Sequence, residues 1–184
     1  RALARAAHRR HQRVVLLLDR QMAANAAPAE KPLDLIVWPD TAVPWLLEDA
    51  GLIFDEARAA SGNVPMLLGI QRAEGPRYFN SLVALDRAGW LIASYDKHHL
   101  VPFGEYIPFG DVMARFGISA FAAQAGNGYS AGPGVRVLDL GRAGKVLPLI
   151  CYEAVFPQDL RAAERADWIV QITNDSWFGN LAGP

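Results

Sequence analysis

Residues 145–153 have the sequence KVLPLICYE, in which a continuous apolar run ends directly before Cys151. An uninterrupted run of this length is typical of a strand buried on both faces of a sheet. Cys151 therefore follows the carboxyl end of a predicted core strand, which is where α/β proteins commonly bind ligands. It is the single cysteine of the chain, so no internal disulfide can form and the CxxC patterns of zinc and redox sites are absent.

The composition of the 184 residues is that of a folded domain, with 52% hydrophobic and 20% charged residues. The formal net charge of -1 gives no reason to expect nucleic acid as a partner. No apolar run approaches the roughly 18 residues that a membrane-spanning helix needs. The chain begins inside an expected helix without an initiator methionine. We therefore expect residues 1–184 to be part of a catalytic domain from a longer protein.

Buried strands alternate with helical segments along the chain, and this alternation predicts an α/β domain with a mixed sheet. Buried strands are expected at 33–38, 65–70 and 168–173, hairpins at 79–95 and 135–150, and helices at 1–26, 46–60, 112–116 and 157–165.

Polar side chains follow four of the expected strands: Asp40, Lys97, Cys151 and the pair Asn174–Asp175. Strand ends of this kind can meet at one edge of the sheet. A thiol nucleophile needs a proton acceptor and a group that stabilises the oxyanion formed on the substrate, and Asp40 and Lys97 are of the right types. Each also has a plain structural interpretation: Cys151 as a buried apolar thiol, Asp40 as a helix cap and Lys97 as a solvated loop residue.

The sequences around these residues resemble four motifs of the nitrilase superfamily of carbon–nitrogen hydrolases, in the family's order. The motifs are LIVWPDTAVP at 35–44, YDKHHL at 95–100, LICYE at 149–153 and TNDSWFG at 173–179. Within that superfamily, HLVPFGEYIP at 99–108 is similar to the apolipoprotein N-acyltransferase family in particular. The resemblance implies a four-layer αββα sandwich with mixed sheets, incomplete in this chain.

The resemblance also implies a role for each site residue. Cys151 would be the nucleophile that forms a thioester, and Asp40 would be the general base. Lys97 would stabilise the oxyanion, helped by the backbone N–H of Tyr152. Glu105 would orient Lys97, and Tyr152 and Glu153 match positions that flank the nucleophile. Neither a cofactor nor a metal is expected.

The implied activity is transfer of a fatty acyl chain from a phospholipid to the N-terminal diacylglyceryl-cysteine of apolipoproteins. The parent protein would lie in the bacterial inner membrane through its own spans, with this domain facing the periplasm.

Two alternatives stay open. The family's base is normally glutamate, and the shorter Asp40 permits either activity or an inactive relative. A soluble amidase or nitrilase acting on small amides or nitriles would use the same residues.

His98 and His99 are adjacent in sequence, and without further ligands we interpret them as loop residues rather than as a metal site.

Overall fold

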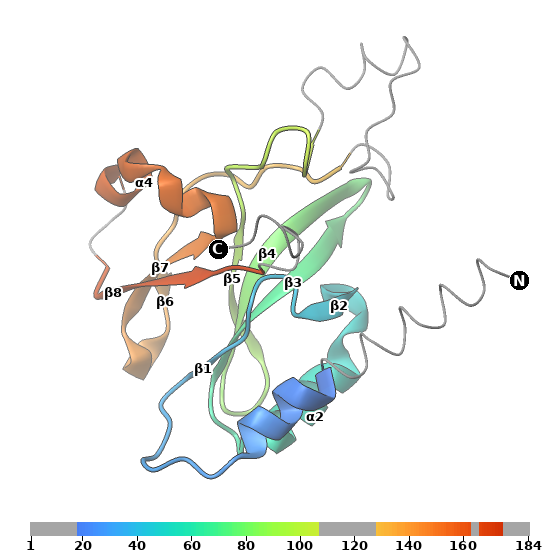
Figure 1. Ribbon diagram of the computed structural model, residues 1–184, viewed down its shortest axis with the longest axis vertical. Coiled ribbons are helices and arrows are strands. Elements are labelled where there is room, and N and C mark those ends of the chain that lie inside the picture. The colour runs from blue at the N-terminus through green and yellow to red at the C-terminus, as the bar shows by residue number, and fades with distance from the viewer. Residues whose placement is uncertain (1–17, 107–127, 163–165, 175–184) are drawn as a thin grey trace, which may run out of the picture.

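The computed structural model describes residues 18–106, 128–162 and 166–174, and these residues form two mixed β-sheets with helices (Figure 1). The first sheet has the order β1-β3-β4-β5, and β2 also pairs with β3; the second has the order β6-β7-β8. The strands are β1 (Ile36–Val37), β2 (Val43–Leu46), β3 (Met66–Glu74), β4 (Arg77–Leu85), β5 (Leu91–Asp96), β6 (Leu138–Asp139), β7 (Lys145–Ile150) and β8 (Trp168–Ile172).

Both sheets combine parallel and antiparallel pairs, as the sequence predicts. In the first sheet β1 and β2 run parallel to β3, while β3–β4 and β4–β5 are antiparallel. In the second sheet β6 is antiparallel and β8 parallel to β7. The Asp86 carboxylate accepts the N–H groups of Ala88 and Trp90, which closes the predicted turn between β4 and β5.

The helical elements differ from the prediction mainly at their ends. Residues 18–26 are helical, and the remaining elements are η1 (Leu47–Asp49), α2 (Gly51–Ala60), η2 (Gly141–Ala143), η3 (Cys151–Val155) and α4 (Pro157–Ala162). The helix expected at 46–60 starts later, because residues 43–46 pair with β3 as a strand. The first 17 residues of the helix expected at 1–26, and the helix expected at 112–116, lie outside the described residues.

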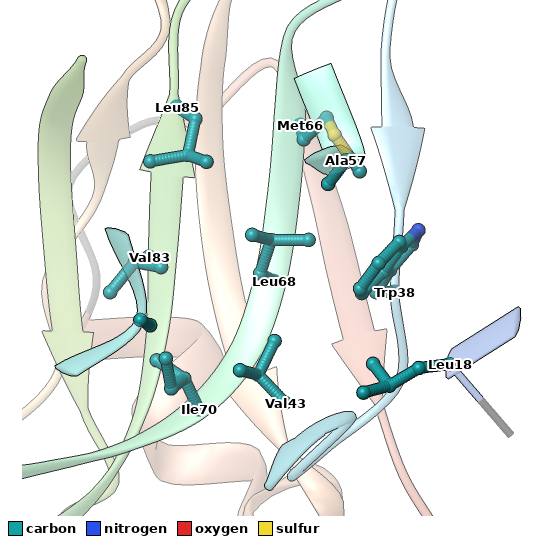
Figure 2. Close-up of a cluster of buried hydrophobic side chains, with 10 residues drawn as sticks. Leu18, Trp38, Val43, Ala57, Met66, Leu68, Ile70, Val83 and Leu85 are labelled. Carbon is teal, nitrogen blue, oxygen red and sulfur yellow. The ribbon is translucent and has the colours of Figure 1, made fainter. Parts of the chain in front are cut away.

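A first hydrophobic cluster lies between the first sheet and the helices (Figure 2). Alternate residues of β3 and β4 point into it, since successive side chains of a strand face opposite sides. Leu18 and Ala57 reach it from the two helices. Its buried members are Leu18, Trp38, Val43, Ala50, Ala57, Met66, Leu68, Ile70, Val83 and Leu85.

A second cluster lies between the two sheets and packs them face to face. The first sheet contributes Leu67, Leu82, Ala84 and Tyr95, and the second contributes Leu138, Val146, Ile150, Val170 and Ile172. The α/β fold with mixed sheets is therefore confirmed, and the complete four-layer sandwich stays a prediction. Within the described part of the chain, no helix is both long enough and apolar enough to cross a membrane.

Candidate active site

Polar residues that follow β1, β5, β7 and β8 lie at one end of the two packed sheets. The Asn174 side chain, after β8, donates to the carbonyl oxygen of Asp40, after β1, at 3.3 Å. The backbone N–H of His98, after β5, donates to the Glu153 carboxylate, after β7, at 2.8 Å. Both contacts join the first sheet to the second. The structure thus joins strand ends that are far apart in sequence.

Lys97 is buried, with 1% of its side chain exposed, and its charge is paired. Its Nζ lies 2.8 Å from Oε1 of Glu105, and Oε2 of Glu105 accepts the N–H of Val101 at 2.8 Å. The backbone carbonyl of Lys97 accepts the N–H of Gly132. A buried ammonium held by one carboxylate has a fixed position, and an ammonium in a site of low polarity strongly stabilises developing negative charge.

Asp40 is buried, with 4% of the residue exposed. Burial raises the pKa of its carboxyl group; the Asn80 side chain and the Lys97 charge oppose this shift, and the charge of Glu105 adds to it. Among the described residues, Oδ1 of Asp40 has no hydrogen-bond partner. A buried carboxylate with a raised pKa and a free oxygen is suited to accept a proton.

The backbone of Asp40 lies directly against β3 at Gly69. A Cβ atom at Gly69 would lie 2.3 Å from the carbonyl oxygen of Pro39 and 2.6 Å from Cα of Asp40. Only glycine therefore permits this approach, which is a known use of glycine inside strands. The contact sets how far Asp40 lies from the sheet.

Cys151 is the first residue of η3 and has a positive φ of 51°. The left-handed conformation costs a residue other than glycine roughly 1–2 kcal/mol. A sharp turn between a strand and a helix is a known way to present a nucleophile away from the backbone. The side chain is partly buried and packs against the cluster between the sheets.

Glu153 is fully buried and connects this turn to the segment after Lys97. Its Oε2 accepts the N–H of Ile150 at 2.9 Å, directly before Cys151. Its Oε1 lies at hydrogen-bond distance from the hydroxyl of Tyr95 and from the backbone N–H of His98. A buried carboxylate is costly unless it is paired in this way. Glu153 therefore fixes the turn at Cys151 relative to the segment after Lys97.

Tyr152 lies on the surface next to the buried carboxylate, with 36% exposure. Its ring packs edge-to-face on Phe156, with ring centroids 5.0 Å apart. Its backbone N–H, expected to help Lys97, belongs to the turn at Cys151.

Sequence analysis missed two residues of this site. Asn80, in the middle of β4, is buried and opposes the shift of the Asp40 pKa. Tyr129 lies close enough to Asp40 and Glu105 that burial, followed by these two charges, raises its pKa to about 12. Its phenol therefore stays protonated at neutral pH and can only act as a neutral hydrogen-bonding group. Asn80 lies inside a strand and Tyr129 lies in a glycine-rich segment, and neither location indicates a site residue from sequence.

The chain is similar in sequence to several curated bacterial proteins. It is 37% identical over 180 residues to an apolipoprotein N-acyltransferase of Sinorhizobium fredii, which covers 92% of this chain and 34% of that protein. It is 43% identical over 159 residues to the apolipoprotein N-acyltransferase of Rhizobium leguminosarum bv. trifolii, and this match covers 82% of this chain and 30% of that protein. The chain thus spans about a third of the length of these relatives.

Solved structures with the same fold include an amidase from Nesterenkonia sp., at a TM-score of 0.61 and 21% identity, with 91% of this chain and 64% of that chain covered. XC1258 from Xanthomonas campestris, a CN-hydrolase superfamily protein, matches with a TM-score of 0.55 and 20% identity. The match covers 87% of this chain and 59% of that chain. In a structure of a point mutant of the amidase from Nesterenkonia sp. AN1, the acetamide moiety of fluoroacetamide is covalently added at the active-site cysteine.

The family model described as carbon-nitrogen hydrolase matches residues 8–184, which is nearly the whole chain. This chain is therefore a member of the carbon-nitrogen hydrolase family.

Proposed function

We propose that this domain catalyses acyl transfer through a thioester on Cys151, with a phospholipid as acyl donor and the N-terminal diacylglyceryl-cysteine of an apolipoprotein as acceptor. The whole protein would then be a lipoprotein-maturing enzyme of the bacterial inner membrane, with this domain on the periplasmic side. The proposal is supported by the curated relatives that match most of this chain, which are named apolipoprotein N-acyltransferase.

In the first half-reaction Asp40 takes the thiol proton and the sulfur of Cys151 attacks the ester carbonyl of the phospholipid. Negative charge develops on the carbonyl oxygen, and Lys97 and the backbone N–H of Tyr152 stabilise it. The tetrahedral intermediate expels the lysophospholipid oxygen, which takes the proton back from Asp40. A thioester and a lysophospholipid result, and no cofactor is consumed.

In the second half-reaction the α-amine of the acceptor attacks the thioester carbonyl. Asp40 removes a proton from the attacking nitrogen, the same groups stabilise the oxyanion, and the carbon–sulfur bond breaks. The Cys151 thiolate leaves and takes the proton from Asp40, which restores the enzyme and releases an amide. Glu105 holds Lys97 in position through both steps and touches no reacting atom.

One observation supports this scheme above the others: the buried Lys97 ammonium lies 2.8 Å from Glu105, and its charge also acts on the buried Asp40. A lysine with only a structural role needs one carboxylate partner. Here the charge of Lys97 also acts on a second carboxylate, that of Asp40. The pKa of Asp40 is raised, and its Oδ1 has no hydrogen-bond partner among the described residues. This arrangement suits a base that works next to an oxyanion.

The test is intact-mass spectrometry of the purified protein after incubation with a phospholipid of defined acyl chains. We expect a mass increase of one fatty acyl group on the wild type, its removal by hydroxylamine, and no increase on Cys151→Ala. Asp40→Asn keeps the shape of the base without its charge and should slow the appearance of the adduct by about a hundredfold or more. An adduct that persists in Cys151→Ala would refute the proposed nucleophile.

The alternatives give different results in the same experiment. An amidase would leave the phospholipid intact and form a hydroxylamine-sensitive adduct with small amides instead. An inactive relative would form neither adduct, and Asp40→Glu would then create activity. In an active enzyme, Asp40→Glu only changes the rate.

A further inference from the structure

Two histidines and an aspartate from distant parts of the chain meet beside the candidate active site. Nε2 of His98 lies 3.2 Å and Nε2 of His99 lies 2.8 Å from the same oxygen, Oδ2 of Asp159. One ligand atom from each residue falls within 4.8 Å of the others. From the sequence alone, no further ligand could be assigned to the two histidines. The structure places Asp159, in α4, beside them.

His98 has polar neighbours at both ring nitrogens. Its Nδ1 lies 2.8 Å from the Tyr95 hydroxyl and 2.8 Å from Oε1 of the buried Glu153, and its Nε2 faces Asp159 on the opposite side. A neutral imidazole has one N–H and one lone pair. In the tautomer that carries the proton on Nδ1, the lone pair of Nε2 points toward Asp159 and can bind a metal ion.

We propose that a divalent transition metal ion, with zinc as the best match, is bound by His98, His99 and Asp159, whose ligand atoms lie within 4.8 Å of one another. Imidazole nitrogen and carboxylate oxygen are the common nitrogen and oxygen ligands of Zn²⁺. A tetrahedral ion with bonds of about 2.0–2.2 Å holds its ligand atoms roughly 3.3–3.6 Å apart. The observed separations of 3.2 and 2.8 Å are shorter than this by less than about 1 Å, which side-chain shifts can supply.

The surroundings of His98 are those of a metal-bound histidine. Histidine ligands usually donate their second ring N–H to a carboxylate, which fixes the tautomer and orients the ring. Glu153 occupies that position, and it accepts from the Tyr95 hydroxyl and the backbone N–H of His98 as well. The ring of His99 stacks on Phe156, with centroids 3.8 Å apart and an angle of 14° between the planes.

The site is mostly shielded from solvent and would join two segments. The side chains of His98 and Asp159 are 12% and 11% exposed, and that of His99 is 30% exposed, which leaves one side of the cluster for a water as fourth ligand. The ion would connect the segment directly after Lys97 to α4. Its role is to hold that segment, and no step of the proposed acyl transfer depends on it.

The experiment is a zinc titration by isothermal calorimetry on the intact, chelator-treated protein. The background is Cys151→Ala, so that thiol binding does not contribute. We expect one Zn²⁺ per chain and at least roughly tenfold weaker binding in Asp159→Asn and in His99→Gln. Co²⁺ in place of zinc should show the visible absorption of a tetrahedral site, and this absorption should be lost in both variants.

Asp55→Asn, an exposed change on α2, is the matched control and should leave binding unchanged. His8→Gln with His11→Gln tests the other two histidines and should also have no effect. Circular dichroism shows whether each variant is folded, and the two ligand variants are judged independently. Absence of Zn²⁺ binding, or equal binding by wild type and both ligand variants, would overturn the proposal; direct contacts of the two imidazoles with Asp159 would then account for the cluster.

Discussion

Replacement of Gly69 by alanine tests whether the close approach of two backbones sets the position of Asp40. The new Cβ would lie 2.3, 2.6 and 2.8 Å from atoms of Pro39, Asp40 and Thr41, all of them backbone. Real Cβ atoms essentially never approach closer than 3.0 Å. The difference between 3.0 and 2.3 Å, about 0.7 Å, is the least displacement that the segment around Asp40 must make.

The displacement has two measurable consequences. Alanine gains about 0.5–1 kcal/mol over glycine inside a strand, but overpacking of a tight contact costs about 1–3 kcal/mol. We therefore expect Gly69→Ala to lower the free energy of unfolding by up to about 2.5 kcal/mol in urea denaturation. A misplacement of about 1 Å in an active site can cost on the order of a hundredfold in rate. Formation of the acyl-enzyme should accordingly slow by roughly ten- to a hundredfold, as measured by mass spectrometry.

Gly51→Ala is the matched control, because no atom lies within 4 Å of its added Cβ at the start of α2. It should leave the acylation rate unchanged and the stability unchanged or slightly higher. If Gly69→Ala behaves like Gly51→Ala in both assays, the backbone contact does not position Asp40 and the reasoning is wrong.

Three further predictions follow from the charged groups. Lys97→Met removes the buried cation and should lower the acylation rate by at least about a hundredfold in single-turnover assays, while binding of phospholipid to the protein, measured by vesicle flotation, changes little. Because burial raises the folded-state pKa of Asp40, ionisation of this group reduces stability as pH rises above 3.8 through that raised pKa. Asp40→Asn should therefore gain stability relative to wild type between pH 4 and pH 7 in urea denaturation, and an equal difference at both values would contradict the shift. The Asp96 carboxylate accepts two hydrogen bonds from Arg72, 2.7 and 2.6 Å long; Asp96→Asn removes its charge and one of the two acceptor oxygens, and should cost about 1.5–3 kcal/mol of unfolding free energy. Arg72→Met combined with Asp96→Asn should cost less than the sum of the single changes, and additive costs would show that the pair does not interact.

The sequence predicted the candidate residues that follow strands, Asp40, Lys97 and Cys151, but not Asn80 or Tyr129. The apolar run before Cys151 and the stretch before Asp40 predict strands, because continuous burial requires continuous apolar sequence. Lys97 follows a hairpin whose turn residues are evident from sequence. The order of these motifs identified the family, and the match over residues 8–184 confirms it. The assigned roles remain predictions that the experiments above test.

Local sequence was less informative where pairing partners decide the structure. The strand expected at 33–38 shortens to two residues. Residues 43–46 form a strand, although only Leu46 was assigned to an element, the helix expected at 46–60. Both outcomes depend on β3, because β1 and β2 each pair with it. A strand exists only where a neighbour accepts its hydrogen bonds, and no pattern within six residues specifies that neighbour.

Only the tertiary structure determined how the site residues meet. Glu153 contacts the segment after β5 across more than 50 residues, and Asp159 reaches His98 across 61. Gly69 lies next to Asp40 because β1 and β3 pair in parallel, and the local sequence around either residue does not specify this pairing. Periodicity and composition report which residues are buried and in what local geometry. The distances between side chains far apart in sequence come from sheet pairing and packing, which form only when the whole chain folds.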